Sequence, residues 1–172
     1  MQSGKSESSR LRAATPADET FLRAVYAGTR AEELARVPWS DEQKRAFTDM
    51  QFAAQDAHYR RHYPTAQYLI IEVQDVPAGR LYVDRWEKEI RIVDIAMLPE
   101  HRRAGVGTKL LRELQDEARA ARKALTIHVE KFNPALRLYQ RLGFRQIEDK
   151  GVYLFLEWKA EMARAEDAEG TE

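Results

Sequence analysis

The strongest constraint on the fold is a change of hydrophobic period near Tyr68. From there three segments alternate apolar and polar residues: YLIIEV (68–73), GRLYVDR (79–85) and EIRIVDIAM (89–97). The turn-forming segment DVPAG separates the first two, and WEKE separates the last two. Alternation with period two places apolar side chains on one face of a strand. The pattern therefore predicts three strands linked by hairpins.

Helical patterns precede these strands. Thr15-Pro16 followed by Asp18 predicts a helix start, and Ser40 with Gln43 forms the capping-box pattern that begins a second helix. The apolar residues expected to line one face of this second helix are Phe47, Met50, Ala54 and Ala57.

The rest of the chain alternates between the two periods. We expect a helix at 105–122, a strand at 125–130, a short helix after Asn133-Pro134, and strands near 144–148 and 152–158. With a short strand at 11–13, the order is β-α-α-β-β-β-α-β-α-β-β. This order predicts a mixed α/β fold and not a doubly wound parallel sheet.

Composition bounds the class of protein. The chain has 172 residues, with 28 basic and 28 acidic side chains and no cysteine. The charge balance argues against nucleic-acid or membrane partners, and the missing cysteine excludes disulfide and thiolate chemistry. No apolar run approaches the roughly 18 residues of a membrane span, so a cytoplasmic protein is expected. We expect one domain at 9–159, between a disordered lead-in at 1–8 and a loose acidic tail at 160–172.

The clearest chemical signal is the junction MLPEHRRAGVGT between the third of these strands and the next helix. Gly105 and Gly107 let a ligand approach backbone N–H groups, and the first four N–H groups of a helix have no partner within it. The helix lacks a polar cap, and Lys109 stands in its first turn, where the helix dipole favours an acid. A bound phosphate would accept these N–H bonds and pair with Arg102, Arg103 or Lys109. The alternative is a tight turn without a ligand.

Two widespread phosphate motifs do not fit this junction. The P-loop pattern G-x-x-x-x-G-K-[ST] is absent, and the dinucleotide fingerprint needs a third glycine and a downstream acid within a βαβ unit. A nucleotide site here requires another framework.

Two segments together resemble the GNAT superfamily of acyl-CoA-dependent N-acyltransferases. RRAGVG (102–107) fits its (Gln/Arg)-x-x-Gly-x-(Gly/Ala) motif, and NPALRLYQRLGF (133–144) is similar to its second motif. Matching motifs cover 90–158. The resemblance implies a central mixed, mostly antiparallel sheet flanked by about four helices. It also implies N-acetyltransfer with acetyl-CoA as co-substrate and no metal.

The resemblance further implies which residues hold the co-substrate. The backbone of Ile95, Ala96 and Met97 would pair with the pantetheine arm and polarise the thioester carbonyl. Asn133 would bond a pantetheine amide, and Tyr139 would stand at the sulfur as proton donor. The pyrophosphate would be held by the backbone amides of Arg102, Arg103, Ala104, Gly105, Val106, Gly107 and Thr108.

Both downstream residues also have structural interpretations. Asn133 ahead of Pro134 is a good helix N-cap, which is compatible with ligand binding. Tyr139 on a helix face is also typical of a core aromatic residue.

Two polar residues interrupt apolar strands and compete for the role of general base. His128 stands five positions before Asn133, where some members of the family carry a catalytic Glu, and its reference pKa of about 6.5 suits proton uptake near neutrality. Asp94 precedes Ile95, but an unperturbed carboxylate is a poor base unless burial raises its pKa. Each is also interpretable as a hydrogen-bonded structural residue. We favour His128, with an acid-side limb in kcat/KM near its reference pKa and Asp94 orienting it or the acceptor.

These observations predict direct acetyl transfer from acetyl-CoA to an amine in a ternary complex. The alternatives are a different acyl-CoA, or a fold that binds CoA or a protein partner without turnover. His58 and His62 lie one helical turn apart, but with no third ligand evident we expect no metal. The acceptor, a small molecule or a peptide or protein amine, is not readable, and monomer and homodimer both stay open.

Overall fold

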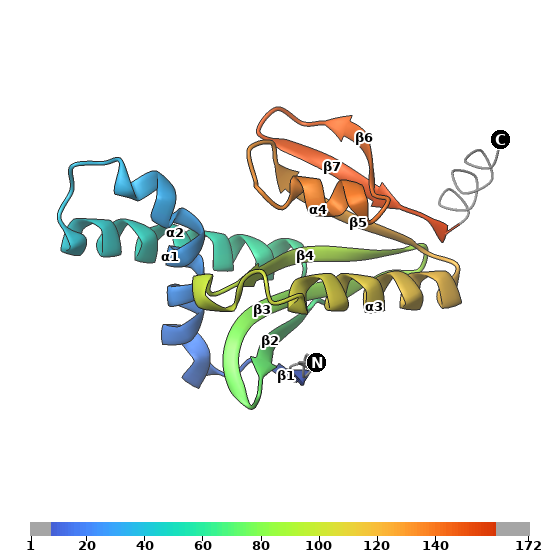
Figure 1. Ribbon diagram of the computed structural model, residues 1–172, viewed down its shortest axis with the longest axis horizontal. Helices are drawn as coiled ribbons and strands as arrows, with labels where there is room; N and C mark the ends of the chain where they lie inside the picture. The colour runs from blue at the N-terminus through green and yellow to red at the C-terminus, as the bar shows by residue number, and fades with distance from the viewer. Residues whose placement is uncertain (1–7, 161–172) are drawn as a thin grey trace, which may run out of the picture. The chain divides into compact units, whose positions relative to one another are not determined.

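The computed structural model describes residues 8–160 (Figure 1). The predicted lead-in and acidic tail, apart from their innermost residues, lie outside the described residues. The strands are β1 (Ser9–Ala13), β2 (Gln67–Val73), β3 (Val76–Arg85), β4 (Glu89–Met97), β5 (Ala124–Glu130), β6 (Arg145–Asp149) and β7 (Tyr153–Trp158). The helices are α1 (Glu19–Ala35), α2 (Asp41–His62), α3 (Val106–Ala121) and α4 (Leu136–Arg141), with 3-10 turns at Pro16–Asp18 and Pro99–His101. The predicted element order is confirmed.

The strands form a seven-stranded sheet in the order β1-β2-β3-β4-β5-β7-β6. β1 and β2 pair antiparallel, as do β5 with β7 and β6 with β7. β4 and β5 pair parallel, because the chain between them crosses over through α3. The predicted mixed, mostly antiparallel sheet is therefore confirmed.

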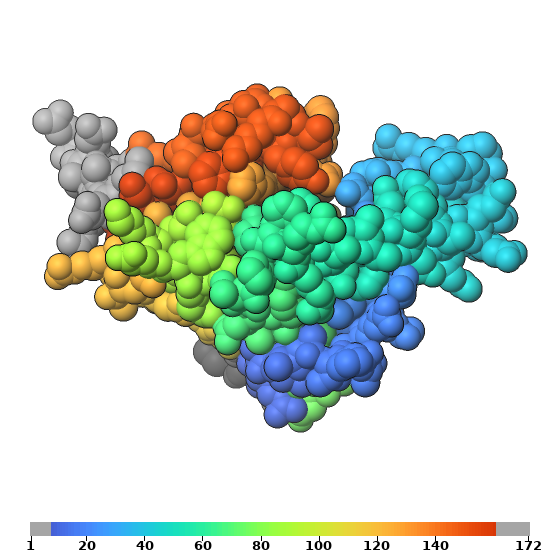
Figure 2. Space-filling view, turned by 180° about the vertical axis from the view of Figure 1, so that it is seen from behind, coloured from blue at the N-terminus to red at the C-terminus, as the bar shows by residue number. Residues whose placement is uncertain are grey.

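The chain forms two compact units, and β3, β4 and α3 run from one into the other. The first unit contains the residues up to Tyr82 together with Asp94–Gly107, and the second contains Val83–Val93 and the residues from Thr108 onward. In the first unit, Figure 2 shows the outer surface of α2, in teal, beside the light-blue segment that joins it to α1. The expectation of a single domain stays a prediction.

The buried face of α2 differs from the apolar face predicted for it. The side chains that α2 buries are Thr48 and Phe52, whereas Met50 is 63% exposed. Ala54 and Ala57 are also exposed. The capping box at Ser40 forms as predicted. The predicted face was wrong because α2 turns inward a face with polar contacts: Tyr59 donates to Asp94, and Gln55 accepts from Arg80.

In the second unit α3 packs through an apolar face. Its buried side chains include Leu110, Leu111, Leu114 and Ala118. Gln115 donates from Nε2 to the carbonyl of Leu142 at 2.8 Å, which ties α3 to the end of α4. Gly143 follows with φ of +89°, and a Cβ there would lie 3.4 Å from the Trp158 ring. The left-handed backbone therefore favours glycine here, whereas an added Cβ would only come into ordinary contact with the Trp158 ring.

Candidate functional site

The C-terminal half of β4 carries the backbone predicted to bind pantetheine. The parallel ladder with β5 pairs Glu89–Ile92 with Ala124–Ile127, and Ile95–Met97 lie beyond its last pair. On the other side Gly79 of β3 lets the strands approach, because a Cβ there would collide with the carbonyl oxygen of Ala96. The segment Ile95–Met97 is therefore held along one side by β3.

The loop after β4 exposes backbone at the start of α3. Its chain turns through left-handed conformations, with φ of +62° at Arg103 and +83° at Gly105. A Cβ added at Gly105 or Gly107 would meet no atom within 4 Å, so the space above both is open. The buried side chain of Val106 anchors the first residue of the helix, and the first turn of α3 carries no acidic residue. An open helix start of this kind is chemically suited to an anion, because the first N–H groups of a helix have no partner within it.

Arg102 holds the loop in place. Its Nε donates to the carbonyl of Met97 at 3.2 Å, and its NH2 nitrogen donates to the carbonyl of Gly28 in α1 at 3.1 Å. Gly28 lets Pro99 of the loop lie close to α1, because a Cβ at Gly28 would lie 3.1 Å from Pro99. The Arg102 guanidinium is thus bound to two backbone carbonyls.

Asp94 lies in a polar cluster of the first unit. Its Oδ2 accepts from the Tyr59 hydroxyl at 2.8 Å and from Arg80 at 2.9 Å. Arg80 is only 2% exposed and also donates to Gln55 at 2.9 Å. Coulombic attraction by Asp94 helps raise the Arg80 pKa above its usual value against the opposing effect of burial. Asp94 therefore neutralises a buried cation, which favours its structural interpretation.

His128 lies in a second cluster, in the other unit. It pairs across the strands with Phe155 of β7, and the two rings stack with centroids 4.6 Å apart. Lys150 Nζ stands 3.2 Å from its Nε2. Burial, followed by the positive charges of Arg91 and Lys150, lowers the His128 pKa to about 4, with Glu148 and Glu89 opposing the shift. The imidazole is therefore neutral near pH 7 and is a weaker base than its reference pKa predicts.

Asn133 and Tyr139 lie in the same unit as His128. Asn133 is exposed, and its Oδ1 accepts from the backbone N–H of Ala135 at 2.9 Å. Asn133 therefore begins an Asx turn three residues ahead of α4, and the N-cap position falls on Ala135. Tyr139 is 4% exposed, with its ring edge-on to Phe144 at 5.5 Å. This packing agrees with the core-aromatic interpretation and leaves the role of the hydroxyl to experiment.

The structure thus groups the predicted residues by unit. The first unit holds Asp94, Ile95–Met97 and the loop to Gly107, and the second holds Thr108, His128, Asn133 and Tyr139. The partners of the two base candidates were not predicted from the sequence. Arg80 offered a signal, since a cation inside the apolar run GRLYVDR needs a buried counter-charge. Lys150 offered none, because it stands in a polar turn.

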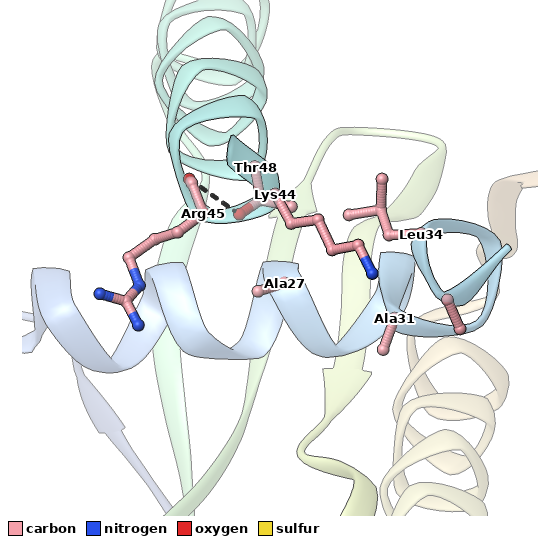
Figure 3. A pocket seen from close by; sticks show the side chains of 7 residues that line it. Ala27, Ala31, Leu34, Lys44, Arg45 and Thr48 are labelled. Carbon is pink, nitrogen blue, oxygen red and sulfur yellow. Dashed lines mark hydrogen bonds between the residues drawn. The ribbon is translucent and has the colours of Figure 1, made fainter. Parts of the chain in front are cut away.

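A pocket of about 340 Å³ lies between α1 and α2 in the first unit. Its lining residues are Ala27, Ala31, Leu34, Ala35, Lys44, Arg45 and Thr48. Figure 3 shows Lys44 and Arg45 pointing in opposite directions from the start of α2, with Lys44 extending toward Leu34. The pocket contains none of the predicted site residues.

Two other features bear on metals and membranes. Within residues 8–160, no cluster of three or more His, Asp or Glu side chains is placed to hold a metal ion. The His58 and His62 rings stack with centroids 4.1 Å apart, and His62 Nδ1 contacts the His58 carbonyl. No helix in this part of the chain has the length and apolar character needed to cross a bilayer.

Comparison with known proteins agrees with this fold. The model of the acetyltransferase (GNAT) family matches residues 29–144. The chain therefore belongs to the GNAT acetyltransferase family. An N-alpha-acetyltransferase from Sulfurisphaera tokodaii is 33% identical over 64 residues, which span 36% of this chain and 38% of that protein.

Solved structures with the same fold include two complexes. PaiA N-acetyltransferase from Thermoplasma acidophilum, in complex with coenzyme A, has a TM-score of 0.67 at 15% identity, covering 88% of this chain and 99% of that one. YncA, a putative acetyltransferase from Salmonella typhimurium with its cofactor acetyl-CoA, has a TM-score of 0.50 at 24% identity, covering 88% and 93%. These similarities show the fold.

Proposed function

We propose that the protein is an N-acetyltransferase that moves the acetyl group of acetyl-CoA directly to an amine. The observation that carries this proposal is the open backbone at Gly105 and Gly107, where α3 begins in a family whose relatives are solved with CoA and acetyl-CoA. The open space fits a pyrophosphate held by N–H groups. No metal is required by the proposal, and a cytoplasmic location stays part of it.

Backbone groups and the Asn133 side chain would make the remaining contacts with acetyl-CoA. The backbone of Ile95, Ala96 and Met97, beyond the ladder with β5, would pair with pantetheine, and the loop backbone from Arg102 to Thr108 would hold the phosphates. The Asn133 amide is exposed and retains its N–H₂ group for a pantetheine carbonyl, because its Oδ1 is already bonded to Ala135.

The transfer itself needs no covalent enzyme intermediate. The amine nitrogen forms a bond to the thioester carbon, the carbon–sulfur bond breaks, and the amine loses a proton while CoA leaves as a thiol. The absence of cysteine removes the strongest nucleophile for a two-step route.

The test is incubation of the full chain with acetyl-CoA and a panel of peptide, polyamine and small aromatic amines, read as free thiol. We expect thiol release that depends on the amine. Faster release from a longer acyl-CoA would instead identify another acyl donor. CoA binding without thiol release from any donor would identify a non-catalytic CoA-binding protein.

We expect the pH dependence of kcat/KM to separate the two base candidates. If His128 is the base, its lowered pKa moves the acid-side limb from near 6.5 to about 4, so the wild-type rate stays flat as the pH falls through 6. His128→Gln then depends on acceptor deprotonation, and its rate rises with pH toward the amine pKa, about 8 for an α-amine.

Asp94→Asn is the matched comparison, because it keeps the size of the side chain beside Arg80 and Tyr59. It should retain the wild-type pH profile. A wild-type profile in His128→Gln, with a changed one in Asp94→Asn, would reverse the assignment.

A further inference from the structure

The cluster around His128 already contains a primary amine of the chain. Lys150 Nζ lies 3.2 Å from His128 Nε2 and 5.1 Å from the centroid of the Phe155 ring. His128 stacks on the same ring, with 24° between the planes. The imidazole nitrogen and the aromatic ring together form a binding site, called here the seat, that suits an alkylammonium group.

The turn between β6 and β7 holds Lys150 in this place. Its backbone N–H donates to the Tyr153 carbonyl at 2.8 Å, and Gly151, with φ of +88°, turns the chain. The Gly151 N–H also donates to Asp149 Oδ1 at 2.9 Å. The backbone is therefore fixed, and only the long side chain, which is 42% exposed, has to move for Nζ to leave or enter the seat.

In the contact between Lys150 and His128, the lysine is the hydrogen-bond donor and the imidazole is the acceptor. Because the imidazole is neutral near pH 7, its Nε2 accepts and the Lys150 ammonium donates. The neighbouring charges are Arg91, which lies over the Phe155 ring at 5.0 Å, and Glu148, which is 3.9 Å from Nζ. The proton of Lys150 thus points at the nitrogen that the proposed mechanism uses as base.

Other lysines of the described chain lie in different surroundings. Lys131 Nζ is 2.9 Å from Asp149 and Lys159 Nζ is 3.5 Å from Glu157, both closer than the 3.9 Å between Lys150 Nζ and Glu148. Lys131, one residue beyond the end of β5, offers a reference amine near the same strand pair.

We propose that Lys150 is a self-acetylation site, the amine of the chain itself that accepts an acetyl group from bound acetyl-CoA. This inference rests on the proposed acetyltransfer. Nζ forms a bond to the thioester carbon, the carbon–sulfur bond breaks, and the products are an acetyl-lysine and free CoA thiol. The amine loses two protons in all: one to His128 Nε2 and then solvent, the other to the departing thiolate.

Acetylation would change the cluster that performs it. The modified side chain carries no charge, so His128 loses one of the two cations that lower its pKa. Phe155 loses the ammonium from its face, and an external amine can take that seat.

The test is intact-mass and peptide mass spectrometry of the full chain during incubation with acetyl-CoA and no added amine. We expect one acetyl group to appear on Lys150, at a rate on the order of 100-fold above the rate at Lys131. This factor is the lower end of the range that a general base usually contributes. The rate should not change on dilution of the protein, because the reaction is intramolecular. Lys150→Arg should abolish the label, Lys131→Arg should leave it, and His128→Gln should slow Lys150 to the rate of Lys131.

Equal labelling of Lys150 and Lys131, or equal labelling of Lys150 in the heat-unfolded chain, would overturn the proposal. The amine panel separates this failure from that of the proposed function. Turnover of external amines without Lys150 labelling rejects self-acetylation alone, whereas absence of both rejects the acetyltransfer itself.

Discussion

Replacement of Gly107 by glutamate should weaken CoA binding by on the order of 100-fold or more. The open space above Gly107 is where the proposed pyrophosphate approaches the backbone, and a glutamate would fill it and place a negative charge beside the phosphates. Juxtaposed like charges cost several kcal/mol, and about 1.4 kcal/mol corresponds to a tenfold change in Kd. Isothermal calorimetry with CoA measures the effect directly.

The fold should survive this change. Gly107 is the second residue of α3 and has no left-handed backbone, so a side chain causes no strain there. A glutamate in the first turn also interacts favourably with the helix dipole, and Tm should stay equal or rise slightly. Gly107→Ala, which adds bulk without charge, is the matched control and should weaken binding less. Unchanged CoA affinity in a folded Gly107→Glu protein would reject the anion site.

Tyr139→Phe should lower kcat about 10²- to 10⁴-fold with little change in acetyl-CoA affinity, the range expected for loss of a general acid–base group. The reference pKa of a phenol, about 10, lies above that of a thiol, about 8.5, so the hydroxyl holds its proton near pH 7 and can hydrogen-bond the leaving sulfur. Single-turnover rates with saturating acetyl-CoA test this against Kd.

The substitution isolates the hydroxyl because phenylalanine keeps the ring. Tyr139 is buried against Phe144, so the packing of α4 stays the same and the protein should remain folded. Tyr153→Phe serves as control, since that side chain is 44% exposed on β7. An unchanged kcat in Tyr139→Phe would assign Tyr139 to the core alone.

Element order and the proposed anion site could be predicted from local pattern. The change from helical to alternating period at Tyr68 and the turn residues between runs depend on neighbouring residues only, so they are readable without the fold. The same holds for Gly105 and Gly107, because a helix start leaves its N–H groups unpaired in any protein. The burial of α2 was not readable, since its inward face combines Thr48 and Phe52 with polar contacts.

The sequence by itself determined the family of the chain and the order of its elements, and it supplied the proposed phosphate site. Only the tertiary structure decided what surrounds the two base candidates. Asp94 meets residues 14 and 35 positions away in sequence, and Lys150 comes from 22 positions away to His128. A pKa depends on burial and on the charges within a few ångströms, and those are set by contacts between distant segments. The sequence therefore named His128 as a base near its reference pKa, whereas packing beside Phe155, Arg91 and Lys150 makes it a neutral, weaker base with an amine already bound.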